Sequence, residues 1–203
     1  MPTLRRILAS AAALLPVAGL AVAAAAPGAA AHRAAEVAPA HASATVPTGP
    51  AAGGGRSTEW VPYHQEDLSY AAGEACAFAL TSTVVSDDEY YRNVAFYSDG
   101  AAHTQLFRGA LVIRWTNTET DESVVRDQSG RAFLEYRHNG LLRTLTAQSG
   151  HFSARLTAGS SPGKGMYYVG GAWSAVDIHP DATRTLVLGP HGTSENLCRT
   201  LAG

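Results

Sequence analysis

Hydrophobic and polar residues alternate with a period of two over most of the chain after residue 75. Cys76, Phe78 and Leu80 alternate with small or polar neighbours, and Leu111, Ile113 and Trp115 share one phase of a later segment. Successive side chains of a strand point to opposite faces of a sheet, so this period predicts half-buried β-strands.

Residues that favour turns divide this pattern into about eight or nine strands. Ser86-Asp87-Asp88 and Ser149-Gly150 are expected to end strands, and Gly170-Gly171 is expected to form a bulge or bend within one. Asn139-Gly140 predicts a hairpin with a type I′ turn. We therefore expect strands at residues 76–85, 90–98, 104–116, 123–126, 131–138, 141–147, 152–156, 166–178 and 183–188.

The strands follow one another with short turns and almost no helix. This layout predicts a single all-β domain over residues 58–203, an up-and-down meander that forms a small barrel. A two-sheet β-sandwich is the alternative. Thr193 or Ser194 is expected to cap a short C-terminal helix that extends through Leu201.

The first part of the chain has the pattern of an export signal. Arg5 and Arg6 precede an apolar run to about Ala26, and an Ala-x-Ala site lies at residues 29–31. We expect a Sec-type signal peptide over residues 1–31 and a secreted, extracellular protein with no membrane span after cleavage. An uncleaved membrane anchor is the alternative.

Residues 32–57 consist mainly of Ala, Pro, Gly, Thr and Ser and end near Gly53-Gly54-Gly55. Such a segment buries too little apolar surface to offset its ordering entropy, so it is interpreted as a disordered tether.

Two cysteines, Cys76 and Cys198, occur in the chain. In an exported protein without a CxxC motif, two cysteines favour a disulfide, which would tie the first strand to the C-terminal helix. Two buried thiols are the alternative.

The charge balance excludes some partners. The chain has 17 acidic and 15 basic residues, a net charge of −2, and no polybasic stretch. Removal of Arg5 and Arg6 with the signal peptide makes it more acidic, so nucleic acid is not an expected partner.

Two segments and the choice of basic residues suggest the kind of organism from which the chain comes. Lys164 is the only lysine beside many arginines, as is typical of GC-rich actinobacteria. The segments RGALVIRWTN and DQSGRAFLEY and the strand layout resemble the small exported β-domain proteins of actinobacteria over about residues 59–203. The resemblance implies export and a β fold, and it implies no mechanism.

No local motif indicates catalysis. The chain lacks a GxSxG elbow, and no two histidines have HxH or HxxxH spacing, so no metal site and no cofactor are expected. Asp87, Asp88 and Glu89 are interpreted as a solvated cluster at a strand break. Glu135 and Asp177 lie within strands and are the candidates for acid–base roles.

Aromatic residues from different strands are the candidate ligand-binding group. Trp115, Tyr136, Tyr168 and Trp173 lie in apolar phases, and Arg143 alternates with leucines and could point inward or to solvent. These side chains either fill a closed interior or line a pocket for a small apolar ligand. Of the two, we expect the filled interior.

We therefore expect a non-enzymatic extracellular binding or envelope-associated protein, with a small apolar ligand or an extracellular protein as partner. One alternative is a small β-barrel enzyme of isomerase, cyclase or hydrolase type, with a site assembled from distant strands. The other is a secreted inhibitor or interaction protein. A cavity with convergent polar groups would favour the enzyme, and a filled interior with an exposed apolar patch would favour the others.

Overall fold

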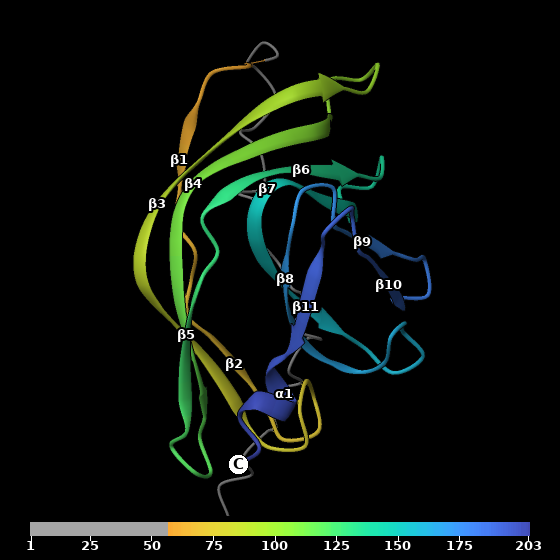
Figure 1. Cartoon of the computed structure of the whole chain (residues 1–203). Coiled ribbons are helices and arrows are strands. Elements are labelled where there is room, and N and C mark those ends of the chain that lie inside the picture. Colours follow the sequence, from red (N-terminus) through yellow and green to blue (C-terminus); the bar gives the residue numbers. More distant parts are fainter. Residues whose placement is uncertain (1–56) are drawn as a thin grey trace, which may run out of the picture. The chain divides into compact units, whose positions relative to one another are not determined.

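The computed structural model describes residues 57–203, which form one antiparallel sheet of eleven strands and a short C-terminal helix (Figure 1). The predicted all-β domain is therefore confirmed. The predicted signal peptide (1–31) and nearly all of the predicted tether (32–57) lie outside the described residues. The elements are β1 (Val61–Tyr63), β2 (Leu68–Tyr70), β3 (Leu80–Phe96), β4 (Ala102–Asn117), β5 (Ser123–Asp127), β6 (Gly130–Tyr136), β7 (Leu142–Leu156), β8 (Gly165–Gly170), β9 (Ala175–Ile178), β10 (Arg184–Val187), β11 (Thr193–Asn196) and α1 (Leu197–Thr200).

The sheet is strongly curved, but within residues 57–203 it does not close into a barrel. Its main path runs β1-β3-β4-β6-β7-β8-β11. The second half of β4 pairs with β5 and its first half with β6, and only β6 carries the ladder on to β7. The expected barrel closure is therefore absent. The two-sheet alternative is not formed either, because all eleven strands belong to one sheet.

Side-chain contacts connect β5 to β8 and β11. Arg126 on β5 forms an ion pair with Glu195 on β11. The Tyr168 hydroxyl on β8 donates a hydrogen bond to the Asp127 carbonyl oxygen at 2.6 Å. Side chains thus hold these strands close where the backbone ladder is interrupted.

Strand β3 runs through Ser86-Asp87-Asp88, so the prediction of a strand break there is wrong. A bulge between Val84 and Ser86 interrupts the register instead. The Asp87 carboxylate accepts a hydrogen bond from the Gln65 N–H at 2.7 Å, and Asp67 accepts one from the Val84 N–H at 2.7 Å. Because Asp87 has a donor on the neighbouring segment, and that segment also bonds to β3 through Asp67, the strand continues through the acidic run.

Strand β7 likewise runs through the predicted break at Ser149-Gly150. Gly150 has a φ of 77° and pairs with Gly130 of β6. A Cβ at Gly150 would lie 1.9 Å from the Ser129 carbonyl oxygen, so only glycine permits this close approach. The strand predicted at residues 166–178 is divided into β8 and β9, which pair with residues 151–156 and 144–146 of β7. The interruption between β8 and β9 begins at the predicted Gly170-Gly171 position.

The Asn139-Gly140 pair forms the predicted hairpin between β6 and β7, but with a different turn. The Arg137 N–H donates to the Leu141 carbonyl oxygen, and the Gly140 N–H donates to the Arg137 carbonyl oxygen, both at 2.8 Å. Of the two turn residues only Gly140 has a positive φ, 79°. The loop is therefore a type I turn followed by a glycine bulge, not a type I′ turn.

The predicted disulfide between Cys76 and Cys198 is present, with the Cα atoms 5.2 Å apart. It joins the segment before β3 to α1 and closes a loop for which chain entropy predicts a stabilisation of about 4–5 kcal/mol, before native strain. Asn196 caps the helix by accepting a hydrogen bond from the Cys198 N–H at 3.0 Å. The predicted caps, Thr193 and Ser194, lie in β11 instead.

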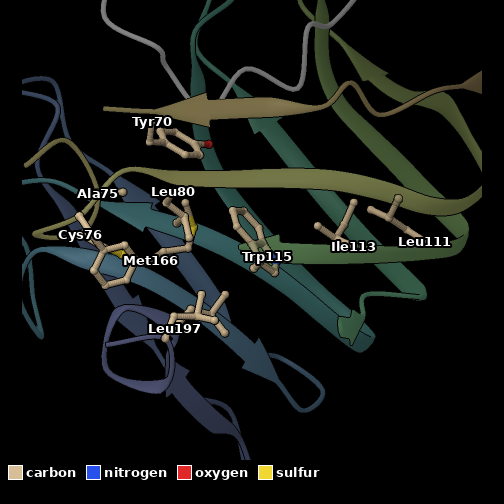
Figure 2. Packing of buried hydrophobic residues seen from close by; sticks show 11 residues of the cluster. Tyr70, Ala75, Cys76, Leu80, Leu111, Ile113, Trp115, Met166 and Leu197 are labelled. Atoms are coloured by element: carbon tan, nitrogen blue, oxygen red, sulfur yellow. The ribbon is translucent and has the colours of Figure 1, made fainter. Parts of the chain in front are cut away.

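Most of the buried apolar side chains of residues 57–203 form three clusters. The first surrounds the disulfide and Trp115, which is 4% exposed (Figure 2). Its buried members are Tyr70, Ala75, Cys76, Phe78, Leu80, Leu111, Ile113, Trp115, Met166, Leu197 and Leu201. The interior beside α1 is thus well packed.

Candidate functional site

A cavity of about 190 Å³ lies among the inward side chains of the sheet. Strands far apart in the sequence contribute to it, and its lining combines apolar side chains with polar and charged ones. The apolar lining includes Phe107, Leu134, Leu145, Phe152, Met166 and Val176. The polar lining includes Glu89, Gln128, His151, Ser153, Arg155 and Arg184. The expectation of a filled interior therefore holds in the cluster around the disulfide but not throughout the sheet.

Trp115 connects the packed cluster to the cavity. It lies on β4 opposite Ser82 of β3, packs in the first cluster and also lines the cavity. Figure 2 shows its ring among Leu80, Ile113 and Met166. Within residues 57–203 the buried indole N–H has no hydrogen-bond partner, so it is an unsatisfied donor on a residue that lines the cavity.

Two buried arginines lie together in the lining. Arg155 on β7 is 7% exposed, and its Nη1 donates to the Glu74 carboxylate at 2.6 Å. Arg184 on β10 is 6% exposed, and its Nη1 donates to the Arg155 carbonyl oxygen. Burial, with the nearby Arg155 charge, lowers the pKa of Arg184. The guanidinium of Arg155 also lies 5.5 Å from the ring centroid of Tyr70, so this part of the cavity is basic and aromatic.

Glu89 is the acidic group of the lining. On β3 it pairs with Tyr63 of β1 on one side and with Gly109 of β4 on the other. Burial, and to a lesser degree the Asp87 charge, raises the pKa of the Glu89 carboxyl to about 7. Burial and the Glu89 charge raise the pKa of Tyr63 to about 12, so its hydroxyl stays protonated near neutral pH.

A row of glycines continues across the sheet from Glu89. Gly109, Gly130 and Gly150 are successive cross-strand partners on β4, β6 and β7. A Cβ at Gly109 would lie 2.2 Å from the Asp88 carbonyl oxygen, and a Cβ at Gly130 would lie 2.3 Å from that of Ser149. The strands approach too closely for side chains at these three positions, and Gly130 of the row lines the cavity.

The structure brings only Trp115, of the five predicted binding residues, into the cavity lining. Tyr136 is buried in another cluster, and its hydroxyl donates to Gln105 at 2.8 Å. Arg143 is exposed, and Trp173 is 58% exposed. Tyr168 stacks on the His151 ring at 4.8 Å between centroids and is outside the lining.

Glu89, Arg155 and Arg184 were not identified from the sequence as site residues. Glu89 was assigned to a solvated cluster, because the strand was expected to break before it. The candidates Glu135 and Asp177 do not line the cavity; Asp177 accepts a hydrogen bond from Thr144 at 3.0 Å. For Arg155 the position within the apolar Phe152–Leu156 segment was a usable signal, since a charge in a buried strand often has a specific role.

Residues 57–203 contain no group of three or more His, Cys, Asp and Glu side chains arranged to hold a metal ion. In the same part of the chain, no helix has the length and apolar character needed to cross a membrane.

Compared with models of protein families, with curated proteins and with solved structures, the chain matches none of them. The cavity and its polar groups therefore carry the functional argument.

Proposed function

We propose that this chain is an exported protein whose β domain, residues 58–203, binds a small and largely apolar molecule in the cavity without changing it chemically. The observation that carries the proposal is the cavity of about 190 Å³ beside the buried Trp115. Apolar burial drives binding, and the few polar groups orient the ligand.

The disulfide supports action outside the cell. A bond such as that between Cys76 and Cys198 persists in oxidising compartments and is rare in the cytosol. The signal-peptide pattern of residues 1–31 agrees with this setting, and the segment that follows it is suited to tether the domain near the cell envelope.

Tryptophan fluorescence of the full chain tests the proposal. The probes are octanamide, 3-phenylpropanamide and the corresponding carboxylates, octanoate and 3-phenylpropanoate. We expect saturable quenching that Trp115→Phe removes while calorimetry still detects binding. Trp173→Phe is the matched control, because Trp173 is exposed and outside the lining. Absence of saturable binding of all four probes, or a signal that depends on Trp173 rather than Trp115, would contradict the proposal.

An acid–base enzyme of isomerase or cyclase type is the second candidate, and both the polar groups that converge on the cavity, the feature expected to favour an enzyme, and Glu89 support it. A carboxyl group whose pKa of about 7 matches the working pH is well suited to remove and return a proton. Its place in a cavity with Tyr63 supports the same interpretation, since perturbed pKa values cluster at functional sites.

Product analysis separates the two candidates. A probe that binds is incubated with the wild-type chain and with Glu89→Gln, and NMR follows its structure over time. Recovery of unchanged probe from both proteins agrees with binding alone. Conversion by the wild type, together with binding but no conversion by Glu89→Gln, would favour the enzyme.

A further inference from the structure

The charge inside the cavity is not balanced. Arg155 has the Glu74 carboxylate as its partner, whereas Arg184 forms no ion pair with any of residues 57–203. Arg184 is nevertheless 6% exposed and lines the cavity. A buried cation without a counter-charge is costly, so an anion that reached this guanidinium would offset the cost.

Hydrogen-bond donors in the same lining have no partner within the described part of the chain. They include the Trp115 Nε1, the Gln128 Nε2, the Arg184 Nε and the Ser153 hydroxyl. The first three can only donate, and a hydroxyl can also donate. These atoms are themselves covered, so a ligand reaches them only where neighbouring side chains shift, and it must then present acceptor oxygens, since another donor would leave them unpaired.

The number of charges favours a monoanion. Glu74 neutralises Arg155, which leaves Arg184 as one uncompensated buried guanidinium. Two more arginines of the lining, Arg108 and Arg131, are exposed. The opposing charge in the lining is that of Glu89. One planar guanidinium fork matches one carboxylate in charge and geometry, whereas a phosphate dianion would bring a charge in excess.

We propose that the ligand is an apolar carboxylic acid, whose carboxylate pairs with Arg184 and whose apolar remainder packs along the neighbouring strands. This inference rests on the proposed binding function and gives the chemical class of the ligand. Ile178, the cross-strand partner of Arg184, and Val176 on the same strand line the cavity next to the guanidinium. Arg184 and these apolar side chains thus offer adjoining contacts to the carboxylate and the apolar group of one small molecule.

Matched pairs of probes test the inference on the wild-type full chain. Calorimetry compares octanoate with octanamide and 3-phenylpropanoate with 3-phenylpropanamide at about pH 6, where both carboxylates are ionised. We expect each carboxylate to bind about tenfold more tightly than its amide, or better, as for hydrogen bonds to a charged group. Equal affinities would overturn this inference and leave the binding function standing. Binding of none of the four would overturn both.

Substitution of Arg184 locates the effect. Arg184→Met keeps the length of the side chain and removes the charge, so the carboxylate should lose its advantage while the amide keeps its affinity. Arg143→Met is the control, because Arg143 is exposed and outside the lining. An unchanged carboxylate advantage in Arg184→Met, or an equal loss in Arg143→Met, would overturn the assignment. If Arg184→Met does not fold, the wild-type probe pairs still decide the ligand class.

Discussion

The Arg126 guanidinium contacts the Glu195 carboxylate through two hydrogen bonds, Nε to Oε2 at 2.7 Å and Nη2 to Oε1 at 2.6 Å. The Thr200 hydroxyl donates to the same Oε1 at 2.7 Å. This pair joins β5 to β11, where no backbone ladder connects the strands. A two-point arginine–carboxylate contact fixes the relative orientation of the two side chains as well as their separation. It therefore aligns β5 and β11 although no backbone ladder connects them.

Loss of this ion pair should destabilise the domain moderately. Both side chains are partly exposed, so we expect Glu195→Gln to lower the free energy of unfolding by about 0.5–1 kcal/mol at neutral pH. The hydrogen bond from Arg126 lowers the pKa of Glu195. Its contribution is therefore complete above the unfolded-state pKa of about 4.5 and is lost as the pH falls through the lower folded-state value.

Urea unfolding of the wild type and Glu195→Gln at about pH 7 and about pH 3 checks both statements. Glu122→Gln, in an exposed turn, is the matched control and should change little. If the unfolding free energies of wild type and Glu195→Gln differ by the same amount at both pH values, the ion-pair account is contradicted.

Glu89 should make the folded domain less stable as the pH rises. Its pKa is raised to about 7 from 4.5, so the folded state keeps a proton that the unfolded state has released. Stability then falls between about pH 4.5 and pH 7. A shift of one pKa unit corresponds to about 1.4 kcal/mol, so the loss in unfolding free energy is at most about 3 kcal/mol.

Glu89→Gln should remove this slope, because glutamine has a similar shape and does not titrate. We expect it to match the wild type near pH 4 and to exceed its unfolding free energy near pH 8. Asp88→Asn, at the exposed neighbouring position, should keep the slope. Unfolding curves for wild type and Glu89→Gln that run parallel from pH 4 to pH 8 would show that Glu89 is not the titrating group.

The fold was largely predictable because alternation and turn residues are local signals. The hairpin at Asn139-Gly140 followed from such a signal, and the disulfide from Cys76 to Cys198 followed from the presence of two cysteines in a chain with an export signal. The run at Ser86-Asp87-Asp88 misled, since Gln65, the partner of Asp87, lies on a segment that reaches β3 only in the folded chain. Local polarity therefore indicated a break where tertiary hydrogen bonds keep a strand.

The candidate site was much less predictable. The alternation of apolar and polar residues in a strand distinguishes its two faces, but it does not show which face lines a cavity. Trp115 lines the cavity, whereas Trp173, chosen by the same criterion, lies on the surface. Barrel closure depends on whether β5 finds a second partner strand besides β4, which no local pattern specifies. Arg155 on β7 and Arg184 on β10 meet only in the folded sheet, where β9 pairs with both strands.

The glycine row should be sensitive to a single methyl group. A Cβ at Gly130 would lie 2.3 Å from the Ser149 carbonyl oxygen, so Gly130→Ala must push β6 away from β7. We expect a loss of about 1–3 kcal/mol in unfolding free energy, as for other overpacked positions, together with weaker probe binding.

Gly100→Ala is the control for Gly130→Ala. It lies in an open turn with nothing within 4 Å of its added Cβ, at a φ of 92°. It should cost stability through backbone strain of about 1–2 kcal/mol without affecting probe binding. Probe binding that is unchanged in Gly130→Ala, or reduced equally in Gly100→Ala, would contradict the role of the row in shaping the cavity.

Met166 offers the most direct test that the cavity takes up a ligand. It is 1% exposed, lines the cavity and is one of two methionines in the chain, so its ¹³C-labelled methyl signal can be assigned with Met166→Leu. Titration of the labelled full chain with octanoate should shift the Met166 signal saturably, with the affinity found by calorimetry. A Met166 signal that stays in place while octanoate binds, or an octanoate titration without saturation, would contradict binding inside the sheet.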